Sequence, residues 1–133
     1  MHVEGQAHER GANLVEAAFV VPFLLILLVG VVDLGRAYYT YLTIVNAARE
    51  GARWGVAHPT DTSGMCAKVV AEAQNNTPPV ALTCGDVVIV KPGGGVSGSP
   101  VRVTVETSFS PLLGSIVGLS AFPIRYSVAF PIF

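Results

Sequence analysis

The chain has 133 residues, which leaves room for one modest domain and not two. Apolar residues make up 51% of the sequence and charged residues only 13%, well below the roughly one quarter usual for soluble domains. The formal net charge is -1 and there is no basic tract, so no binding to nucleic acid is expected. The shortage of charge is concentrated near the N-terminus.

A run of aliphatic and Phe residues lies between Glu16 and Asp33 and contains no charged side chain. Counted from Leu14 to Val32 it has about 19 residues, close to the roughly 20 that cross a hydrocarbon core. The alternatives are a buried helix of a soluble protein and a cleaved secretory signal peptide. Soluble helices seldom carry so long an aliphatic stretch, and no basic n-region precedes the run. A transmembrane helix is therefore predicted.

The helical pattern continues beyond this run. No Pro occurs between Pro22 and Pro59, and apolar residues recur at spacings of three and four. Residues 12–57 are expected to form one helix about 65–70 Å long, apolar all round in its first half and amphipathic in its second. Pro22 lacks an N–H, which favours a local bend. The predicted apolar stripe of the second half consists of Leu34, Tyr38, Tyr41, Val45, Ala48 and Ala52.

Three small residues, Ala47, Gly51 and Gly55, recur every four residues in the second half of this helix. Such a series lets another backbone approach closely. Two partners remain open at this point. One is the domain of the same chain, and the other is a neighbouring subunit.

Acidic residues mark both ends of the apolar run. Glu16 lies two residues inside it, where a charge costs about 2.5–3.5 kcal/mol at a helix centre and less near the interface. Either Glu16 reaches the headgroups or pairs with Arg10, or a partner molecule supplies a charge for it. At the other end, Asp33 and Arg36 are one helix turn apart and are expected to pair near the membrane surface.

The sequence Gly11-Ala12-Asn13-Leu14-Val15-Glu16, followed by the aliphatic stretch, resembles the prepilin site of type IV pilins and pseudopilins. Together with Asp33-Leu34-Gly35-Arg36 and Asn46-Ala47-Ala48-Arg49-Glu50-Gly51-Ala52-Arg53, it resembles the TadE-like proteins, which are minor pilins or pseudopilins of tight-adherence pilus systems. The resemblance covers about residues 10–57. It implies that a prepilin peptidase cuts after Gly11, removes a leader of residues 1–11 and makes Ala12 the new N-terminus.

The resemblance also implies an assembly role for Glu16, which becomes the fifth residue of the mature chain. Its carboxylate would meet the new N-terminal ammonium of a neighbouring pilin subunit. A lone carboxylate in a low-dielectric bundle is strongly disfavoured, and an opposite charge at contact distance offsets that cost. Because such a contact is heterologous, repeating it builds an open helical filament with the apolar helices as its core.

The two cysteines and the charge pattern disagree about orientation. Cys66 and Cys84 are an even pair, which in an exported domain usually forms a disulfide, with two free thiols as the alternative. Only one Arg precedes the apolar run, whereas Arg36, Arg49 and Arg53 follow it, and positive-inside counting taken literally favours a cytoplasmic C-terminus. The cysteines and the family resemblance favour the reverse. The protein is expected in the inner or cytoplasmic membrane with its domain outside, and in a surface filament after assembly.

Residues 58–133 are expected to form a small α+β domain. A short helix is predicted at about Met65–Asn75. A β-branched run at Asp86–Lys91 and alternating patterns at Val101–Thr107 and Ile124–Phe130 predict three strands. A three-stranded antiparallel sheet packed on the outer half of the long helix follows, giving a pilin-like α+β fold.

One further apolar segment, Ser110–Ala121, is either a short helix or an apolar loop. If exposed, it is a contact patch for neighbouring molecules, although packing within the core is the more common outcome.

Residues typical of catalysis are few. The three His residues have no metal-ligand spacing, Gly93–Gly95 lacks the Lys-Ser/Thr of a phosphate loop, and no nucleophile elbow or carboxylate pair is evident. Neither a metal nor a cofactor is expected, and the chain is not expected to be an enzyme. Two functions are compatible with the sequence. The preferred one is a structural pilin or pseudopilin subunit, and the alternative is a monomeric single-span anchor whose outer domain binds a ligand or scaffolds a secretion complex.

Overall fold

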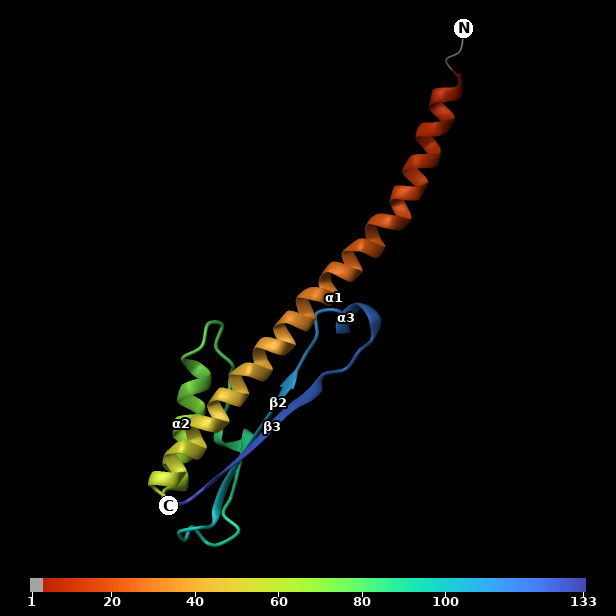
Figure 1. Cartoon of the computed structure of the whole chain (residues 1–133). Coiled ribbons are helices and arrows are strands. Elements are labelled where there is room, and N and C mark those ends of the chain that lie inside the picture. The colour runs from red at the N-terminus through yellow and green to blue at the C-terminus, as the bar shows by residue number, and fades with distance from the viewer. Residues whose placement is uncertain (1–3) are drawn as a thin grey trace.

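A computed structural model describes the backbone of residues 4–133 and the side chains of residues 13–133. Its dominant element is the helix α1, Glu4–Ala57, which has 54 residues and is about 81 Å long at 1.5 Å per residue. Figure 1 shows α1 as one continuous, gently curved helix that passes through Pro22 without a break. The helix begins before the predicted residue 12, because the Glu, Gln, Ala and Arg residues upstream are good helix formers.

A second helix, α2, spans Thr62–Gln74 and packs beside the C-terminal part of α1 (Figure 1). It begins three residues before the predicted start because Asp61 is its N-cap. The Asp61 Oδ1 atom accepts a hydrogen bond of 2.8 Å from the backbone N–H of Gly64. Such a cap satisfies one of the backbone donors that a helix leaves free at its first turn.

The sheet has the predicted number and direction of strands. The strands β1 (Val87–Val90), β2 (Pro100–Phe109) and β3 (Phe122–Pro131) are antiparallel in the order β1-β2-β3. A short 3-10 turn, η1 (Cys84–Asp86), precedes β1, and a one-turn helix, α3 (Gly114–Val117), lies between β2 and β3. The sequence thus predicted the α+β class and the architecture correctly.

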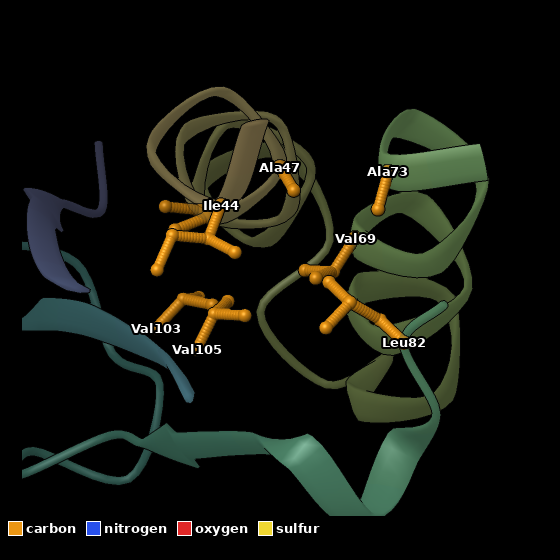
Figure 2. Close-up of a cluster of buried hydrophobic side chains, with 9 residues drawn as sticks. Ile44, Ala47, Val69, Ala73, Leu82, Val103 and Val105 are labelled. Atoms are coloured by element: carbon orange, nitrogen blue, oxygen red, sulfur yellow. The ribbon is translucent and has the colours of Figure 1, made fainter. Parts of the chain in front are cut away.

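The core lies where α1, α2 and one face of the sheet meet. Along β2, the alternating residues Val101, Val103 and Val105 are fully buried, as the strand periodicity requires. Figure 2 shows side chains from both helices and from β2 converging on a common centre. The cluster consists of Ile44, Ala47, Ala48, Ala52, Val69, Ala73, Leu82, Val103 and Val105.

The apolar stripe predicted on α1 is wrong in its first half. Leu34, Tyr38 and Tyr41 are exposed, whereas Val45, Ala48 and Ala52 are buried. The side that faces the domain is rotated by one residue and carries smaller side chains. Besides Val45, Ala48 and Ala52, it includes Asp33, Ala37, Thr40, Ile44, Ala47, Gly51 and Gly55, all buried or half-buried. Small residues let α2 and the sheet approach the helix closely, so the size of the apolar side chains did not indicate the contact face.

Candidate membrane-anchoring and assembly helix

Residues 13–28 of α1 are not covered by any other part of the chain that the structure describes. Every side chain from Asn13 to Leu28 is exposed, including Phe19 at 77%. This helix is long and apolar enough to cross a membrane, and none of the residues in its most apolar stretch is buried by the rest of the chain. Such a surface is unfavourable in water and is covered at no cost by a bilayer. The alternative of a helix buried within a soluble fold is therefore wrong for the described chain.

Glu16 lies within this exposed half. Its carboxylate forms no ion pair with any residue whose side chain the structure describes. The side chain of Arg10, the intramolecular partner considered for it, lies outside the described residues. So do the side chains at the expected processing site, although the backbone of Gly11 and Ala12 is part of α1.

Asp33, at the other end of the apolar run, joins α1 to the sheet. The expected ion pair with Arg36 is present, with Arg36 Nη1 2.9 Å from Asp33 Oδ1. In addition, the Asp33 carboxylate accepts hydrogen bonds from the backbone N–H groups of Leu112 (2.9 Å) and Leu113 (2.8 Å), in the β2–β3 connection. Asp33 is only 7% exposed, and these partners offset the cost of burying its charge.

Arg36 strengthens this junction. Its guanidinium carbon lies 5.2 Å from the ring centroid of Phe109 at the end of β2, a distance suited to a cation–π interaction. The sequence predicted the Asp33–Arg36 pair from its spacing. It did not indicate the two donors on the hairpin, because they lie 79 and 80 residues further along the chain.

The small residues of α1 pack within the same chain. A Cβ atom on Gly51 would overlap the Val69 side chain and lie 3.1 Å from the Met65 carbonyl oxygen. On Gly55 it would lie 2.9 Å from Met65 Sδ. Ala47 is fully buried in the core cluster. Of the two partners left open by the sequence, the structure places the chain's own α2 and β2 against this series.

The disulfide links Cys66 on α2 to Cys84 at the start of η1. It closes a loop with a sequence separation of 18 and so fixes the segment between α2 and the sheet. By the chain-entropy model such a closure stabilises the fold by about 3 kcal/mol. A bridge of this kind is typical of an oxidising compartment.

The far end of the domain is held by a polar cluster around Asp61. Trp54 Nε1 donates a hydrogen bond of 3.1 Å to Asp61 Oδ2, and Ser63 Oγ donates to Asp61 Oδ1 at 2.9 Å. The backbone hydrogen bond from Gly64, with those from Trp54 and Ser63, lowers the pKa of Asp61 below its ordinary value. Because each donor favours the charged carboxylate, the connection between α1 and α2 is most stable with Asp61 ionised.

The helix α1 therefore has two parts. The C-terminal part packs on α2 and the sheet of its own domain, and the N-terminal part is exposed. Residues 11–53 match the family model of the TadE-like proteins. The match confirms the resemblance found in the sequence. No curated protein and no solved structure gives a significant match.

The TadE-like segment coincides with the features just described. It begins at Gly11 of the expected processing site, contains Glu16 and the Asp33–Arg36 pair, and ends at Arg53, within the helix that packs against α2. It covers only part of α1 and does not include the sheet. A relation to tight-adherence pilus proteins is thus supported for the helix, and the single apolar helix is consistent with a membrane anchor.

Proposed function

We propose that this protein is a structural pilin or pseudopilin subunit, not an enzyme, that assembles into or initiates a tight-adherence-type filament for adhesion or secretion. The observation that carries this proposal is the division of α1. Its C-terminal half is buried against α2 and β2, whereas its N-terminal half is exposed, and the TadE-like match covers parts of both halves. The exposed side chains of the N-terminal half can therefore contact lipid before assembly and other subunits after it.

This division bears on how subunits would associate. The series Ala47, Gly51 and Gly55 is occupied within the chain, so it does not supply an intersubunit contact. The apolar side chains of residues 14–32 are the surface that needs a partner outside the bilayer. Filament formation would bury these side chains against the same segment of neighbouring subunits.

Glu16 supplies the proposed specificity of that contact. A prepilin peptidase that cut after Gly11 would create an ammonium on Ala12, and this cation would meet Glu16 of an adjacent subunit. None of the cations whose side chains the structure describes pairs with this carboxylate. In a lipid or helix-bundle environment an unpaired carboxylate is costly, so the pairing would favour one register of neighbouring helices.

The proposed location follows from the apolar half of α1 and from the disulfide of the domain. Before assembly, α1 would cross the inner or cytoplasmic membrane once, with residues 58–133 outside, and afterwards the subunit would lie in an extracellular filament. The Cys66–Cys84 disulfide supports an oxidising compartment for the domain. The distribution of Arg residues, taken by the positive-inside rule, favours the opposite orientation, so the disulfide and the family match carry this proposal.

Intact mass tests processing directly. The protein is purified from membranes and from sheared surface filaments of its natural host, and its mass is compared with that of the full chain. Loss of residues 1–11 in the filament fraction supports the proposal. A full-length chain as the component of sheared filaments would contradict it.

The role of Glu16 is tested with Glu16→Leu and a matched Glu106→Leu control. Glu106 is an exposed carboxylate on β2 that pairs with Arg125 at 3.7 Å, so the control removes one negative charge outside the apolar half of α1. Glu16→Leu should insert in the membrane but assemble poorly, whereas Glu106→Leu should assemble normally. Equal assembly of both variants would favour a monomeric membrane-anchored protein instead.

A further inference from the structure

The connection between β2 and β3 carries an exposed apolar surface. We define the hairpin tip as residues 111–122, which contain α3 and the first residue of β3. None of residues 107–124 is charged. Five large apolar side chains of the tip are about half exposed or more: Leu112, Ile116, Val117, Leu119 and Phe122.

The position of the tip relative to α1 is fixed by three contacts. A Cβ atom on Gly30 would lie 3.3 Å from Leu113 Cδ1, so Leu113 packs directly on the helix at that residue. The Asp33 carboxylate accepts hydrogen bonds from the N–H groups of Leu112 and Leu113. Figure 1 shows α3 beside α1, at the end of the hairpin that points toward the N-terminal half of the helix.

These contacts place the tip at the level where the apolar run ends. Gly30 precedes Val32, the last apolar residue of the run, by about 3 Å along the helix axis. Tyr38, which is exposed, lies about 9 Å beyond Val32, near the outer edge of a headgroup layer, where Tyr is enriched. A bilayer that covers residues 14–32 therefore reaches the tip as well.

The backbone of the tip is suited to such a place. Irregular backbone does not occur where it would face the hydrocarbon of the bilayer, so such a segment must lie at the interface, where headgroups and water reach its unpaired groups. Six backbone N–H groups of the tip have an acceptor in Asp33 or in a carbonyl group of the tip, and Ser115 Oγ donates to the carbonyl oxygen of Leu112. The six donors are Leu112, Leu113, Gly114, Ile116, Val117 and Gly118. The N–H groups of Leu119, Ser120 and Ala121 have no acceptor among the described residues and need headgroups or water.

The opposite end of the sheet has a different surface. The connection between β1 and β2, residues 91–99, contains Lys91, Ser97, Ser99 and four Gly residues. Lys91 Nζ donates to the carbonyl oxygen of Pro59, which places this loop beside the end of α1 that is farthest from the apolar run. Val96 is its one large apolar residue that is exposed. The uncharged apolar surface is thus found at the end of the sheet that faces the span.

We propose that the hairpin tip lies in the lipid interface of the membrane that α1 crosses, as a second membrane contact of the domain. This inference rests on the membrane anchoring in the proposed function. With α1 and the hairpin tip both in contact with lipid, the orientation of the domain relative to the bilayer is fixed. A transmembrane helix alone would leave its tilt unconstrained. The hydrogen bonds from the backbone N–H groups of Leu112 and Leu113 to Asp33 join the tip to α1 next to Val32, where the apolar run ends.

The test uses the full chain in vesicles of phosphatidylcholine and phosphatidylglycerol, with tryptophan as a depth probe. Ile116→Trp places an indole on the tip, Val96→Trp places one on the opposite loop, and Phe23→Trp places one near the middle of the span. All three positions are exposed, so the fold should tolerate them, and denaturant unfolding verifies this. The native Trp54 is kept in every variant, and the parent protein provides its contribution.

Quenching by brominated phosphatidylcholines then reports depth. For Ile116→Trp, we expect a blue-shifted emission and strong quenching by lipids brominated near the headgroup end of the acyl chain. For Val96→Trp, we expect a solvent-like emission without quenching. For Phe23→Trp, we expect the strongest quenching by lipids brominated near the chain terminus.

The outcomes separate the two proposals. If Phe23→Trp is quenched but Ile116→Trp is not, the tip lies in water and only the present inference fails. If the emission of Ile116→Trp is blue-shifted without bromine quenching, another protein subunit covers the tip, which also overturns the inference. If Phe23→Trp itself is not quenched, α1 does not span the bilayer, and the membrane anchoring in the proposed function fails.

Discussion

The two halves of α1 belong to one continuous helix but are built for different surroundings. Residues 14–32 carry Leu, Val, Ile and Phe side chains that touch almost nothing in the described chain. Residues 43–55 contribute Ala47, Gly51 and Gly55, which contact α2 and the sheet closely. Large apolar residues thus mark the half that needs an external partner, and small residues mark the half that folds with its own domain. Substitutions of the same kind should therefore change the stability of the domain in the C-terminal half and leave it unchanged in the N-terminal half.

The largest difference is expected for truncation of an aliphatic side chain. Ile44→Ala removes a fully buried core residue and should lower the free energy of unfolding by about 2–5 kcal/mol. Leu28→Ala, at an exposed position of the other half, should leave domain unfolding unchanged. Denaturant unfolding in detergent micelles, followed by the near-ultraviolet signal of Trp54, measures both. Equal losses would show that the two halves are not independent.

Removal of the disulfide should act on the domain alone. The Cys66→Ser/Cys84→Ser double variant should lose about 3 kcal/mol of unfolding free energy, because the unfolded chain is no longer constrained. Membrane insertion of α1 should be unaffected, as measured by resistance to alkaline extraction. Reductant should destabilise the parent protein to the same extent and have no effect on the double variant. A double variant as stable as the parent protein would be evidence against this constraint.

A smaller difference is expected between two glycines of α1. Gly51→Ala forces a methyl group onto Val69 and the Met65 carbonyl oxygen, and such overpacking costs about 1–3 kcal/mol. Gly35→Ala meets nothing within 4 Å and should be neutral or stabilise by about 0.5–1 kcal/mol through helix propensity. Thermal unfolding of the two variants compares them. A neutral Gly51→Ala would mean that α2 does not pack as closely as described.

The smallest effect concerns the pH dependence of the domain. The Gly64 N–H, followed by Trp54 and Ser63, lowers the pKa of Asp61 in the folded state. Its contribution is therefore complete above the unfolded-state pKa of about 3.9 and is lost as the pH falls through the lower folded-state pKa. Asp61→Asn keeps a capping side chain but does not titrate.

The acid dependence of the Tm should accordingly be shallower in Asp61→Asn than in the parent protein. Part of the dependence should remain, because the side-chain hydrogen bond from Thr83 lowers the pKa of Asp86 as well. If Asp61→Asn keeps the same slope as the parent protein, Asp61 does not contribute to the acid transition.

Much of the fold could be predicted from local patterns. The apolar run from Leu14 to Val32, the strand alternation at Val101–Thr107 and the resemblance at Gly11 and Glu16 each depend on neighbours in the sequence. The length of the apolar run therefore predicted the span, and local composition and periodicity predicted the three strands and the second helix. The start of α2 was placed too late because Asp61 was not considered as its cap.

The candidate site was predicted less completely. The periodicity of α1 predicted an apolar stripe, but Leu34 and Tyr38 of that stripe are exposed, and Tyr41 lies at its edge, where its ring packs against Tyr126. Hydrophobic size favours these residues, whereas close packing of α2 and β2 favours Gly51 and Gly55. Whether large or small residues form the buried face of α1 depends on the elements that pack against it. Those elements are distant in the sequence, so local patterns do not reveal them.

Asp33 shows the same limit most clearly. Its spacing from Arg36 predicted an ion pair, and the pair is present. By itself, the sequence thus determined a helix with an apolar half and a charged residue at the end of that half. Only the tertiary structure decided that this carboxylate binds the backbone of Leu112 and Leu113 and so brings an uncharged hairpin to the end of the span. The reason is physical: helix and strand periodicities depend on near neighbours, whereas a contact between residues so far apart exists only once the sheet has packed on the helix.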